Sequence, residues 1–407
     1  MIVHRSRTTR IAKTDYVMNH YSTIREGARR ARLGSLNRYR PLLWQASAVL
    51  LLLFVGGWMF ANLQQNLTVR NISSGFGFLR REAGLPIAEH LINYRPSDTY
   101  LKALVVGTLN TLWVASIGIV LATALGTLIG IARLSRNWLL AKLTAIYVEF
   151  FRDLPLLLQL LFCYTLLQGL PGVRSALNPI SGVYLSNRGL NLPALIWSPS
   201  FAWVILSALA SMLFALVFYR NLRGARQSTS KSILLAVIAL ATPVVVGFAT
   251  GSSISIDWPV PKGFNIRGGT AITPEFFALL LALVIYNSAF IAEIVRSGLQ
   301  SVGRGQHEAA YALGLKPAQS LKHVVFPQAM RVVIPPMTSQ FLNLTKNSSL
   351  AVAVGYQDIV SVSNTAMNQT GQAIELVGVI MTVYLTISLS ISLLMNFYNK
   401  RMTLVER

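Results

Sequence analysis

Charged residues are scarce in this chain of 407 residues, and acidic residues are the scarcest of them. Only 12% of its residues are charged, whereas a soluble domain carries about 25%. This composition excludes an ordinary soluble enzyme. Lys and Arg number 36 against 14 Asp and Glu, and the formal charge of +22 leaves nucleic acid or a membrane as the partner. The charges lie in short clusters between apolar stretches of about 20 residues, which favours the membrane and not nucleic acid.

Cysteine and the motifs of catalysis are also missing. The single Cys163 cannot form an intrachain disulfide, and none of the five histidines suggests a metal site. No G-x-x-x-x-G-K-S/T phosphate loop occurs, so the chain lacks the usual means of hydrolysing ATP. We therefore expect no catalytic residue, no metal site and no cofactor bound by this chain. No internal repeat is visible either, which counts against a secondary transporter.

Eight apolar runs are long enough to cross a bilayer, whose core needs roughly 20 helical residues. The predicted spans are about 42–62, 101–132, 143–169, 201–219, 232–250, 276–295, 332–357 and 376–399. About 40 mostly polar residues precede the first run, so we expect it to remain as an anchor and not to be cleaved as a signal peptide. The sequence therefore predicts an all-α integral membrane protein.

The distribution of Lys and Arg predicts the orientation, because cytoplasmic flanks carry the excess of positive charge. With the N-terminus inside, 26 of the 36 basic residues lie on cytoplasmic segments and 8 on outer loops. The other two, Lys102 and Lys346, lie within or beside spans. Both termini are therefore expected in the cytoplasm, and the basic tail is expected to meet membrane lipid.

The spans divide the chain into segments of different character. We predict a basic cytoplasmic tail over 1–40, a first span with an outer loop over 41–100, and a cytoplasmic end over 400–407. The outer loops 63–100, 170–200 and 251–275 are rich in Gly, Pro, Asn and Ser. This composition is typical of irregular structure, and each loop is short for a folded domain.

The cytoplasmic segment between the sixth and seventh spans, 298–331, predicts two short helices around a turn. Helix-forming residues begin at Gly305, Gly314 suits a left-handed C-terminal cap, and Pro317 suits the first position of the next helix. The first helix is then about nine residues, or about 14 Å, long. Glu308 near its start is favoured by the helix dipole. Such a helix is expected to dock on a cytosolic partner.

The same segment carries a motif at fixed spacing. It reads Glu308-Ala309-Ala310, with Gly314 and Pro327 following. The motif resembles the EAA loop of ABC importer permeases, and Gly305, Glu308, Ala309, Ala310, Gly314 and Pro327 are the candidate coupling residues. Four further segments resemble the polar amino-acid branch of that family: 147–155, 286–296, 302–306 and 346–350. The resemblance covers about 101–170 and 276–400.

This resemblance implies a permease domain over 101–400 with the core of a type I ABC importer. Its coupling helix would sit in a groove of the ATPase subunit. A minimal permease of the branch has five spans, so the first span and the pair at about 201–250 are additions. The closest likeness is to the larger permeases of general L-amino-acid transport systems.

A function follows from the resemblance. It implies the permease subunit of an L-amino-acid importer in the bacterial inner membrane, working by alternating access. Its implied partners are a second, homologous permease, two copies of an ATPase that uses ATP and Mg, and a periplasmic amino-acid-binding protein. The alternative is an ion-coupled secondary transporter or channel for small polar solutes, which the small number of buried charges disfavours.

Ionisable and polar residues inside spans are candidates for function, because they are costly in the hydrocarbon region. Lys346 lies within the seventh predicted span and is followed by Asn347, Ser348 and Ser349. We expect a local helix break there that faces a wet cavity. The Lys346 ammonium would attract a substrate carboxylate or hold a carboxylate of the chain such as Glu149 or Glu293. A purely structural role at a helix end is equally compatible with the sequence.

Other candidates for the cavity or gate lie on the third and sixth spans. Glu149, Arg152 and Asp153 lie near the cytoplasmic end of the third span, and a structural ion-pair cluster that closes the inner gate is the favoured interpretation. Gln159 is a cavity-lining donor or makes an interhelical hydrogen bond. The same alternatives hold for Asn287 and Glu293, and Glu293 is expected to pair with Arg296 or Arg152. On the second span, small residues recur every four positions at Gly118, Ala122, Gly126 and Gly130, which predicts close helix packing.

Overall fold

The computed structural model describes residues 41–66, 69, 75–222, 229–263 and 265–402. The predicted basic tail 1–40 and most of the cytoplasmic end 400–407 lie outside these residues. The chain forms two compact units, Met1–Ser74 and Gly75–Arg407. In the first unit, the helix Pro41–Asn66 reaches a mean hydropathy of 1.9 and contains the predicted first span.

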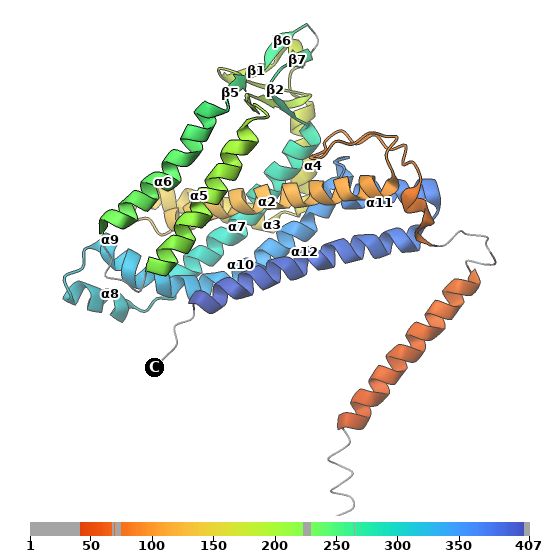
Figure 1. Ribbon diagram of the computed structural model, residues 1–407. Coiled ribbons are helices and arrows are strands. Elements are labelled where there is room, and N and C mark those ends of the chain that lie inside the picture. Colours follow the sequence, from red (N-terminus) through yellow and green to blue (C-terminus); the bar gives the residue numbers. More distant parts are fainter. Residues whose placement is uncertain (1–40, 67–68, 70–74, 223–228, 264, 403–407) are drawn as a thin grey trace, which may run out of the picture. The chain divides into compact units, whose positions relative to one another are not determined.

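The second unit is mostly helical (Figure 1). Counting Pro41–Asn66, four helices of the described chain are long and apolar enough to cross a membrane, the others being α2 (Tyr100–Ala132), α7 (Pro274–Gln300) and α12 (Ala373–Met402). A fifth span is possible if the bent pair α3 and α4 counts as one. The protein is therefore a multi-pass membrane protein, as the hydropathy pattern predicts.

The third predicted span, 143–169, is wrong as a single helix. It consists of α3 (Trp138–Asp153) and α4 (Leu156–Gln168), whose axes meet at 105°. The break falls at Leu154 and Pro155, because proline has no N–H to continue α3 and drives the preceding residue to extended backbone. Leu154 accordingly has ψ 134°.

The long helices pack on small residues. A Cβ added to Gly126 of α2 would lie 2.7 Å from Ile291 of α7, and one added to Gly130 would lie 2.7 Å from the carbonyl oxygen of Ala292. On the same face, Ala122 is completely buried and an added Cβ at Gly118 would lie 3.2 Å from Leu344. The predicted close packing along this face of α2 is therefore confirmed, and it is packing within the chain.

The loops 170–200 and 251–275 are not irregular, contrary to the prediction. They contain the short helix η2 (Val173–Ser175) and eight antiparallel strands: β1 (Leu177–Ile180), β2 (Val183–Ser186), β3 (Gly189–Leu192), β4 (Ala194–Trp197), β5 (Ile254–Asp257), β6 (Val260–Lys262), β7 (Asn265–Arg267) and β8 (Thr270–Ile272). The pairs β3–β8 and β4–β5 join the two loops across the intervening helices, whereas the other pairs lie within one loop. The sheets have the orders β1-β2-β3-β8, β4-β5 and β6-β7. Each loop alone is too short to fold, but the two together form one β-structured module.

Loop 63–100 differs from the other two. Its described part contains the short helix η1 (Phe76–Arg80) and a single β-bridge between Glu82 and Thr99. The predicted irregular character therefore holds here. Phe78, Leu85 and Tyr94 from this loop are buried against α2 and the C-terminal helices, so the loop is packed even without regular structure.

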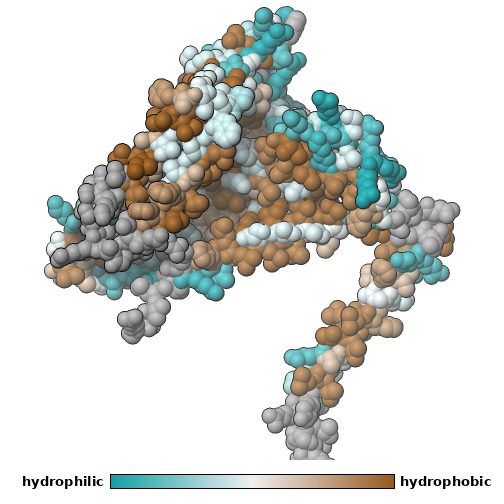
Figure 2. Space-filling view, in the orientation of Figure 1, coloured by the Kyte–Doolittle hydropathy of each residue, from teal (hydrophilic) through white to brown (hydrophobic). Residues whose placement is uncertain are grey.

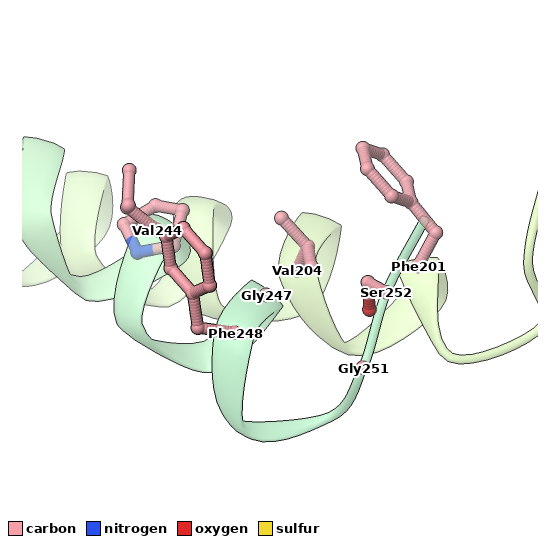
Figure 3. A pocket seen from close by; sticks show the side chains of 8 residues that line it. Phe201, Val204, Val244, Gly247, Phe248, Gly251 and Ser252 are labelled. Carbon is pink, nitrogen blue, oxygen red and sulfur yellow. The ribbon is translucent and has the colours of Figure 1, made fainter. Parts of the chain in front are cut away.

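The additional helix pair consists of α5 (Phe201–Leu222) and α6 (Thr229–Ala249). Pro243 inside α6 lacks the N–H that would bond to the carbonyl of Ala239. The hydroxyl of Ser211 on α5 lies 3.1 Å from that carbonyl and equally 3.1 Å from the carbonyl of Ala208 in its own helix, so its single proton is shared between the two. The pair is thus joined by a specific hydrogen bond. At its strand end, Phe201, Val204, Phe248 and Gly247 line an open apolar groove of about 460 Å³ between the two helices (Figure 3).

The C-terminal part begins after α7 with α8 (Arg304–Ala312) and α9 (Pro317–Ser320), which lie at the far end of α7 from the strands (Figure 1). A π-helical turn, η3 (Leu321–Val325), joins α9 to α10 (Phe326–Asn347). The seventh predicted span, 332–357, is wrong beyond residue 347, because α10 ends there and the 3₁₀ helix η4 (Ser348–Ala353) follows. A further helix, α11 (Ile359–Thr370), precedes α12 and is missing from the sequence prediction.

Hydrophobic side chains cover much of the outer surface of the helices. On the face shown in Figure 2, hydrophilic residues gather at the strand end and on loop 75–99, whereas the helices between are mainly hydrophobic. Leu385, Leu393 and Phe397 of α12 are all more than half exposed. Exposure of these apolar side chains to water would cost free energy, whereas a bilayer would cover them.

Candidate functional site

The loop between α7 and α10 has the conformation that its glycine and prolines predict. Gly314 has φ 73°, and its N–H donates to the carbonyl of Tyr311 at 2.9 Å while Leu315 donates to that of Ala310 at 3.1 Å. This pair of bonds is a Schellman cap. Pro317 occupies the first position of α9. Both short helices of the predicted loop are therefore confirmed, and α8 has nine residues.

The candidate coupling residues are divided between two faces of this loop. Ala310 is buried, with 2% of its surface exposed. Gly305, Glu308 and Ala309 on α8 and Pro327 near the start of α10 are exposed. The large apolar side chains of Tyr311 and Leu313 are 55% and 80% exposed. The loop thus presents a short, capped helix with apolar groups in solvent, as a surface for a partner requires.

The loop is rigidly joined to the helix that follows it. α9, η3 and α10 form one uninterrupted helical path from Pro317 to Asn347. Gln328 on α10 also donates a hydrogen bond of 2.9 Å to Gln306 on α8. α8 is thus connected to α10 by the Gln306–Gln328 hydrogen bond and, through the capped turn Leu313–Lys316, by the helical path that starts at Pro317.

Lys346, Asn347, Ser348 and Ser349 lie at the far end of that helical path. The predicted break is present, since α10 ends at Asn347 and η4 begins at Ser348. The hydroxyls of Ser348 and Ser349 donate to the carbonyls of Thr345 and Lys346, both at 2.7 Å. Lys346 is exposed, whereas Ser348 is buried. Asn347 lines a small apolar void between α4 and α7.

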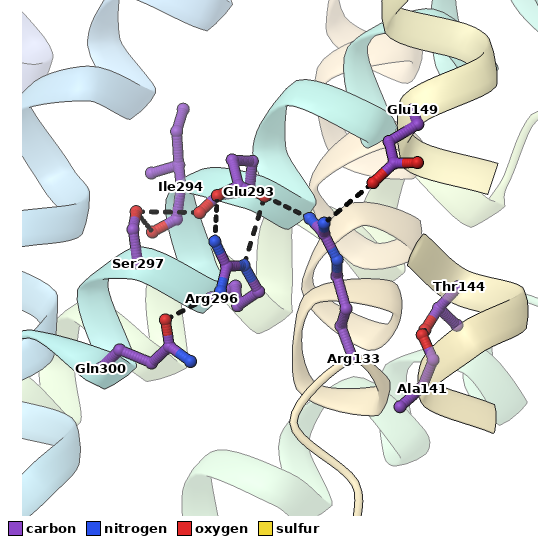
Figure 4. Close-up of polar contacts among 9 residues, drawn as sticks. All are labelled: Arg133, Ala141, Thr144, Glu149, Glu293, Ile294, Arg296, Ser297 and Gln300. Atoms are coloured by element: carbon purple, nitrogen blue, oxygen red, sulfur yellow. Dashed lines mark hydrogen bonds and ion pairs between the residues drawn. The ribbon is translucent and has the colours of Figure 1, made fainter. Parts of the chain in front are cut away.

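An ion-pair network joins the ends of three helices (Figure 4). Arg133, directly after α2, pairs with Glu293 of α7 and lies 4.0 Å from the carboxylate of Glu149 on α3. Arg296 also pairs with Glu293, at 2.6 Å. The Arg133 side chain is only 15% exposed, so its charge depends on these two carboxylates. The network fixes the ends of α2, α3 and α7 relative to one another.

This network corrects the predicted cluster of Glu149, Arg152 and Asp153. Arg152 and Asp153 form no ion pair among the described residues, and the Arg152 guanidinium lies 5.2 Å from the centre of the Phe290 ring instead. Glu293 pairs with Arg296, as predicted, and not with Arg152. The role expected of Arg152 belongs to Arg133, which the sequence places in the loop after the second span.

Glu149 and Glu293 are therefore not partners of Lys346. Both carboxylates lie at the Arg133 network, so the prediction that one of them holds the Lys346 ammonium is wrong. Within the described part of the chain, Lys346 forms no ion pair. Its charge remains available to a group from outside this chain.

Gln159 and Asn287 bond to backbone carbonyls. The Gln159 amide donates to the carbonyls of Phe151 and Leu154, at 2.9 and 3.0 Å, and so satisfies the end of α3 at the bend. Of the two roles expected for Gln159, the structure shows the interhelical hydrogen bond, which joins α4 to the end of α3, and not the cavity-lining donor. The Asn287 amide donates to the carbonyl of Leu283 in its own helix, at 2.8 Å. Both side chains are buried.

The comparisons with known proteins identify the family. The model of the family described as "binding-protein-dependent transport system inner membrane component" matches residues 118–404. The chain belongs to this family, whose members are permease subunits and not enzymes. This confirms the resemblance that the Glu308 to Pro327 motif carries.

Three relatives illustrate the range of the family. The chain is 47% identical over 374 residues to YhdX of Escherichia coli K12, whose name describes an amino-acid ABC transporter permease, and the match covers 90% of this chain and 95% of that protein. It is 44% identical over 375 residues to the general L-amino acid transport system permease protein AapQ of Rhizobium johnstonii, covering 91% and 94%. It is 32% identical over 219 residues to the glutamate/aspartate import permease protein GltJ of Escherichia coli K12, covering 52% and 86%.

The relatives differ in how much of this chain they match. The alignments with YhdX and AapQ leave only about a tenth of this chain uncovered. GltJ, in contrast, matches only about half of this chain. The alternative of an ion-coupled carrier gains no support from any of the three.

Proposed function

We propose that this chain is the permease subunit of an ATP-driven importer of L-amino acids. Family membership supports the permease role, and the names of its relatives support the substrate class. One structural observation carries the proposal furthest. The exposed, capped helix α8 is followed, after the turn 313–316, by an unbroken helical path from Pro317 that leads to the exposed Lys346.

The partners of such a subunit follow from what the chain lacks. It has no phosphate loop, so ATP and Mg are used by a separate ATPase, of which two copies are expected, one for each permease. A second, homologous permease would complete the translocation path. A periplasmic amino-acid-binding protein would deliver the substrate from the outer side.

The topology proposed for this subunit has eight membrane-embedded helical segments and both termini in the cytoplasm of a bacterial inner membrane. The segments are the helix Pro41–Asn66, α2, the bent pair α3 and α4, α5, α6, α7, α10 and α12. The basic residues support this orientation, with 26 inside and 8 outside. The β-structured module then lies on the outer side, and α8 faces the ATPase.

In an alternating-access mechanism, the coupling loop, the Arg133 network and Lys346 each have a function. ATP-driven closure of the ATPase pair displaces α8, and the path through α9, η3 and α10 carries this displacement to Lys346. The Arg133 network is placed to hold the inner ends of α2, α3 and α7 together in one state and to release them in the other. Lys346 attracts the carboxylate that every free amino acid carries.

Co-purification and reconstitution test the function. Solubilised under mild conditions, the subunit is expected to carry a stoichiometric ATPase and a second permease. In proteoliposomes, uptake of a radiolabelled amino-acid mixture should require ATP inside the vesicles and the binding protein outside. Robust uptake by this chain alone would contradict the proposal and support the ion-coupled alternative.

The variant Lys346→Met tests the substrate site. It keeps the apolar stem and removes the charge. Uptake is expected to fall strongly while assembly and basal ATP hydrolysis persist, because the coupling loop is unchanged. Wild-type uptake rate and apparent affinity in an assembled Lys346→Met complex would refute this role.

A further inference from the structure

One face of α10 is open and the other is buried. Val333, Met337 and Leu344 are buried in a cluster with residues of α2 and α7, so this helix lies along two membrane-spanning helices. The exposed positions recur every three or four residues along the opposite face: Val332, Pro335, Pro336, Ser339, Asn343 and Lys346. This spacing places them on a single stripe of the helix.

The stripe is polar over most of its length. Ser339, Asn343 and Lys346 carry hydroxyl, amide and ammonium groups, and within the described part of the chain neither Ser339 nor Asn343 has a side-chain hydrogen-bond partner. Pro335 and Pro336 lack N–H groups, so the carbonyls of Arg331 and Val332 lose their helical donors. From Val332 to Lys346 the stripe extends about 20 Å.

Such a stripe is out of place against lipid. Hydrocarbon offers no hydrogen bonds, and polar side chains at this depth face the bundle interior or water. The stripe therefore faces either an aqueous path or a second polypeptide. Among the described residues Lys346 forms no ion pair, so its ammonium requires water or an anionic ligand from outside this chain.

We propose that Ser339, Asn343 and the carbonyls of Arg331 and Val332 line the route of the amino acid between Lys346 and the coupling loop. The inference rests on the proposed function and specifies its substrate path. Asn343 and Lys346 are three positions apart on one helix, so both reach a single substrate carboxylate. Closer to the coupling loop, the carbonyls of Arg331 and Val332 accept hydrogen bonds from the substrate ammonium. Ser339 lies between these carbonyls and Asn343, and its hydroxyl bonds to the carboxylate or to the ammonium of the substrate.

Uptake by the fully assembled complex tests this route. In Asn343→Leu, which keeps the size and removes both hydrogen-bonding functions, uptake of a radiolabelled mixture of L-amino acids should fall about tenfold, as for loss of a hydrogen bond to a charged group. Ser339→Ala should have a smaller effect of the same kind. The matched control is Thr338→Val, because the Thr338 hydroxyl is already bonded to Ile334 in its own helix, and uptake should not change.

Selectivity separates a substrate contact from a structural one. Asn343→Asp places a carboxylate beside the route, so uptake of acidic amino acids should fall more than uptake of basic ones. A purely structural role would reduce all amino acids alike. Asn343→Gln should restore part of the uptake with the original selectivity.

Labelling gives an independent measurement. In a Cys163→Ser background, Ser339→Cys and Asn343→Cys should react with a water-soluble thiol reagent in the assembled complex, and the amino-acid mixture should slow the reaction. No reaction at either position, loss of the second permease from Asn343→Leu, or unchanged uptake and selectivity would overturn the route. If the wild-type complex imports no amino acid at all, the proposed function fails, and this outcome is distinct from failure of the variants alone.

Discussion

The α2–α7 contact and the α5–α6 contact are both made by apolar helices, yet they are packed very differently. On α2, Gly126 and Gly130 allow α7 so close that an added Cβ would overlap its atoms. On α6, a Cβ added to Gly247 would meet Val204 at an ordinary 3.6 Å. The α2–α7 contact has no room for an added methyl group, whereas the α5–α6 contact has room for one at Gly247. The core is therefore defined by shape, whereas the added pair is defined mainly by its apolar character.

The difference extends to what holds each region in place. The core has the Arg133 network across three helices as well as close packing. The pair α5–α6 has one described hydrogen bond between its helices, from Ser211 to Ala239, and many large side chains that face outward, such as Phe248 at 85% exposure. Lipid can cover such a surface without specific contacts. We expect the core to tolerate little change and the added pair to tolerate much.

The largest effect is expected at the coupling loop, which belongs to the core. Gly314→Val should abolish uptake, because a β-branched residue is strained at φ 73° and the cap that ends α8 would be lost. No atom lies within 4 Å of an added Cβ, so backbone strain is the only cause of the effect. Gly314→Asn is the control, since Asn tolerates this conformation. Normal ATP-driven uptake by Gly314→Val would contradict the coupling role.

The next effect compares the two regions directly. Gly126→Ala should destabilise the solubilised subunit by about 1–3 kcal/mol, because the new methyl group cannot be accommodated between α2 and α7. Gly247→Ala should leave the melting temperature nearly unchanged. Both are measured by thermal unfolding of the purified protein in detergent. Equal shifts in the two variants would mean that the two contacts do not differ in packing.

A smaller effect is expected from the ion-pair network. Arg133→Gln leaves Glu293 with Arg296 alone, so uptake should fall severalfold while the complex still assembles. Arg136→Gln on the same loop is the matched control, since Arg136 is exposed and its loss should change nothing. A full effect in Arg136→Gln would point to the net charge of the loop and not to the network.

The smallest effect belongs to the added pair. Ser211→Ala removes the hydrogen bond to Ala239 and should cost about 1 kcal/mol, the usual worth of one interhelical bond in a membrane. Uptake should be unchanged, because the Ser211 hydroxyl bonds only to carbonyls of the pair itself. Stability and uptake are both measured in Ser211→Ala and in Ser207→Ala. Ser207→Ala is the matched control, since the Ser207 hydroxyl bonds only within its own helix. Lost uptake in Ser211→Ala would assign the added pair a direct part in transport.

Elements with a local cause could be predicted from the sequence. Gly314 and Pro317 specify their cap and helix start through their own backbone preferences, and the loop 298–331 accordingly folds as its residues indicate. The small residues of α2 recur every four positions in the sequence, and this spacing predicts the close packing that the structure shows. Apolar runs located the membrane helices for the same reason, because hydrophobicity is a property of each segment alone.

Elements with a distant cause could not be predicted. Strand β3 pairs with β8, and about 80 residues including two helices lie between them, so the sequence of one loop cannot show that the other loop completes its sheet. Arg133 was counted only as a cytoplasmic charge, because its partners come from two other helices. Pro155 was visible, but a proline near a helix end fixes a bend only once the following segment has a place to pack. In the structure both α3 and α4 pack on α7 at the observed angle of 105°.

The helical path from Pro317 to Asn347 implies reciprocity between its two ends. A rigid connection that carries motion from the coupling loop to Lys346 must carry free energy in the other direction by the same amount. An amino acid that favours one position of α10 therefore favours the matching state of the ATPase by an equal factor. In such a complex the bound amino acid regulates the ATPase as strongly as the ATPase moves the amino acid, and the transmembrane subunit requires no separate sensor of substrate.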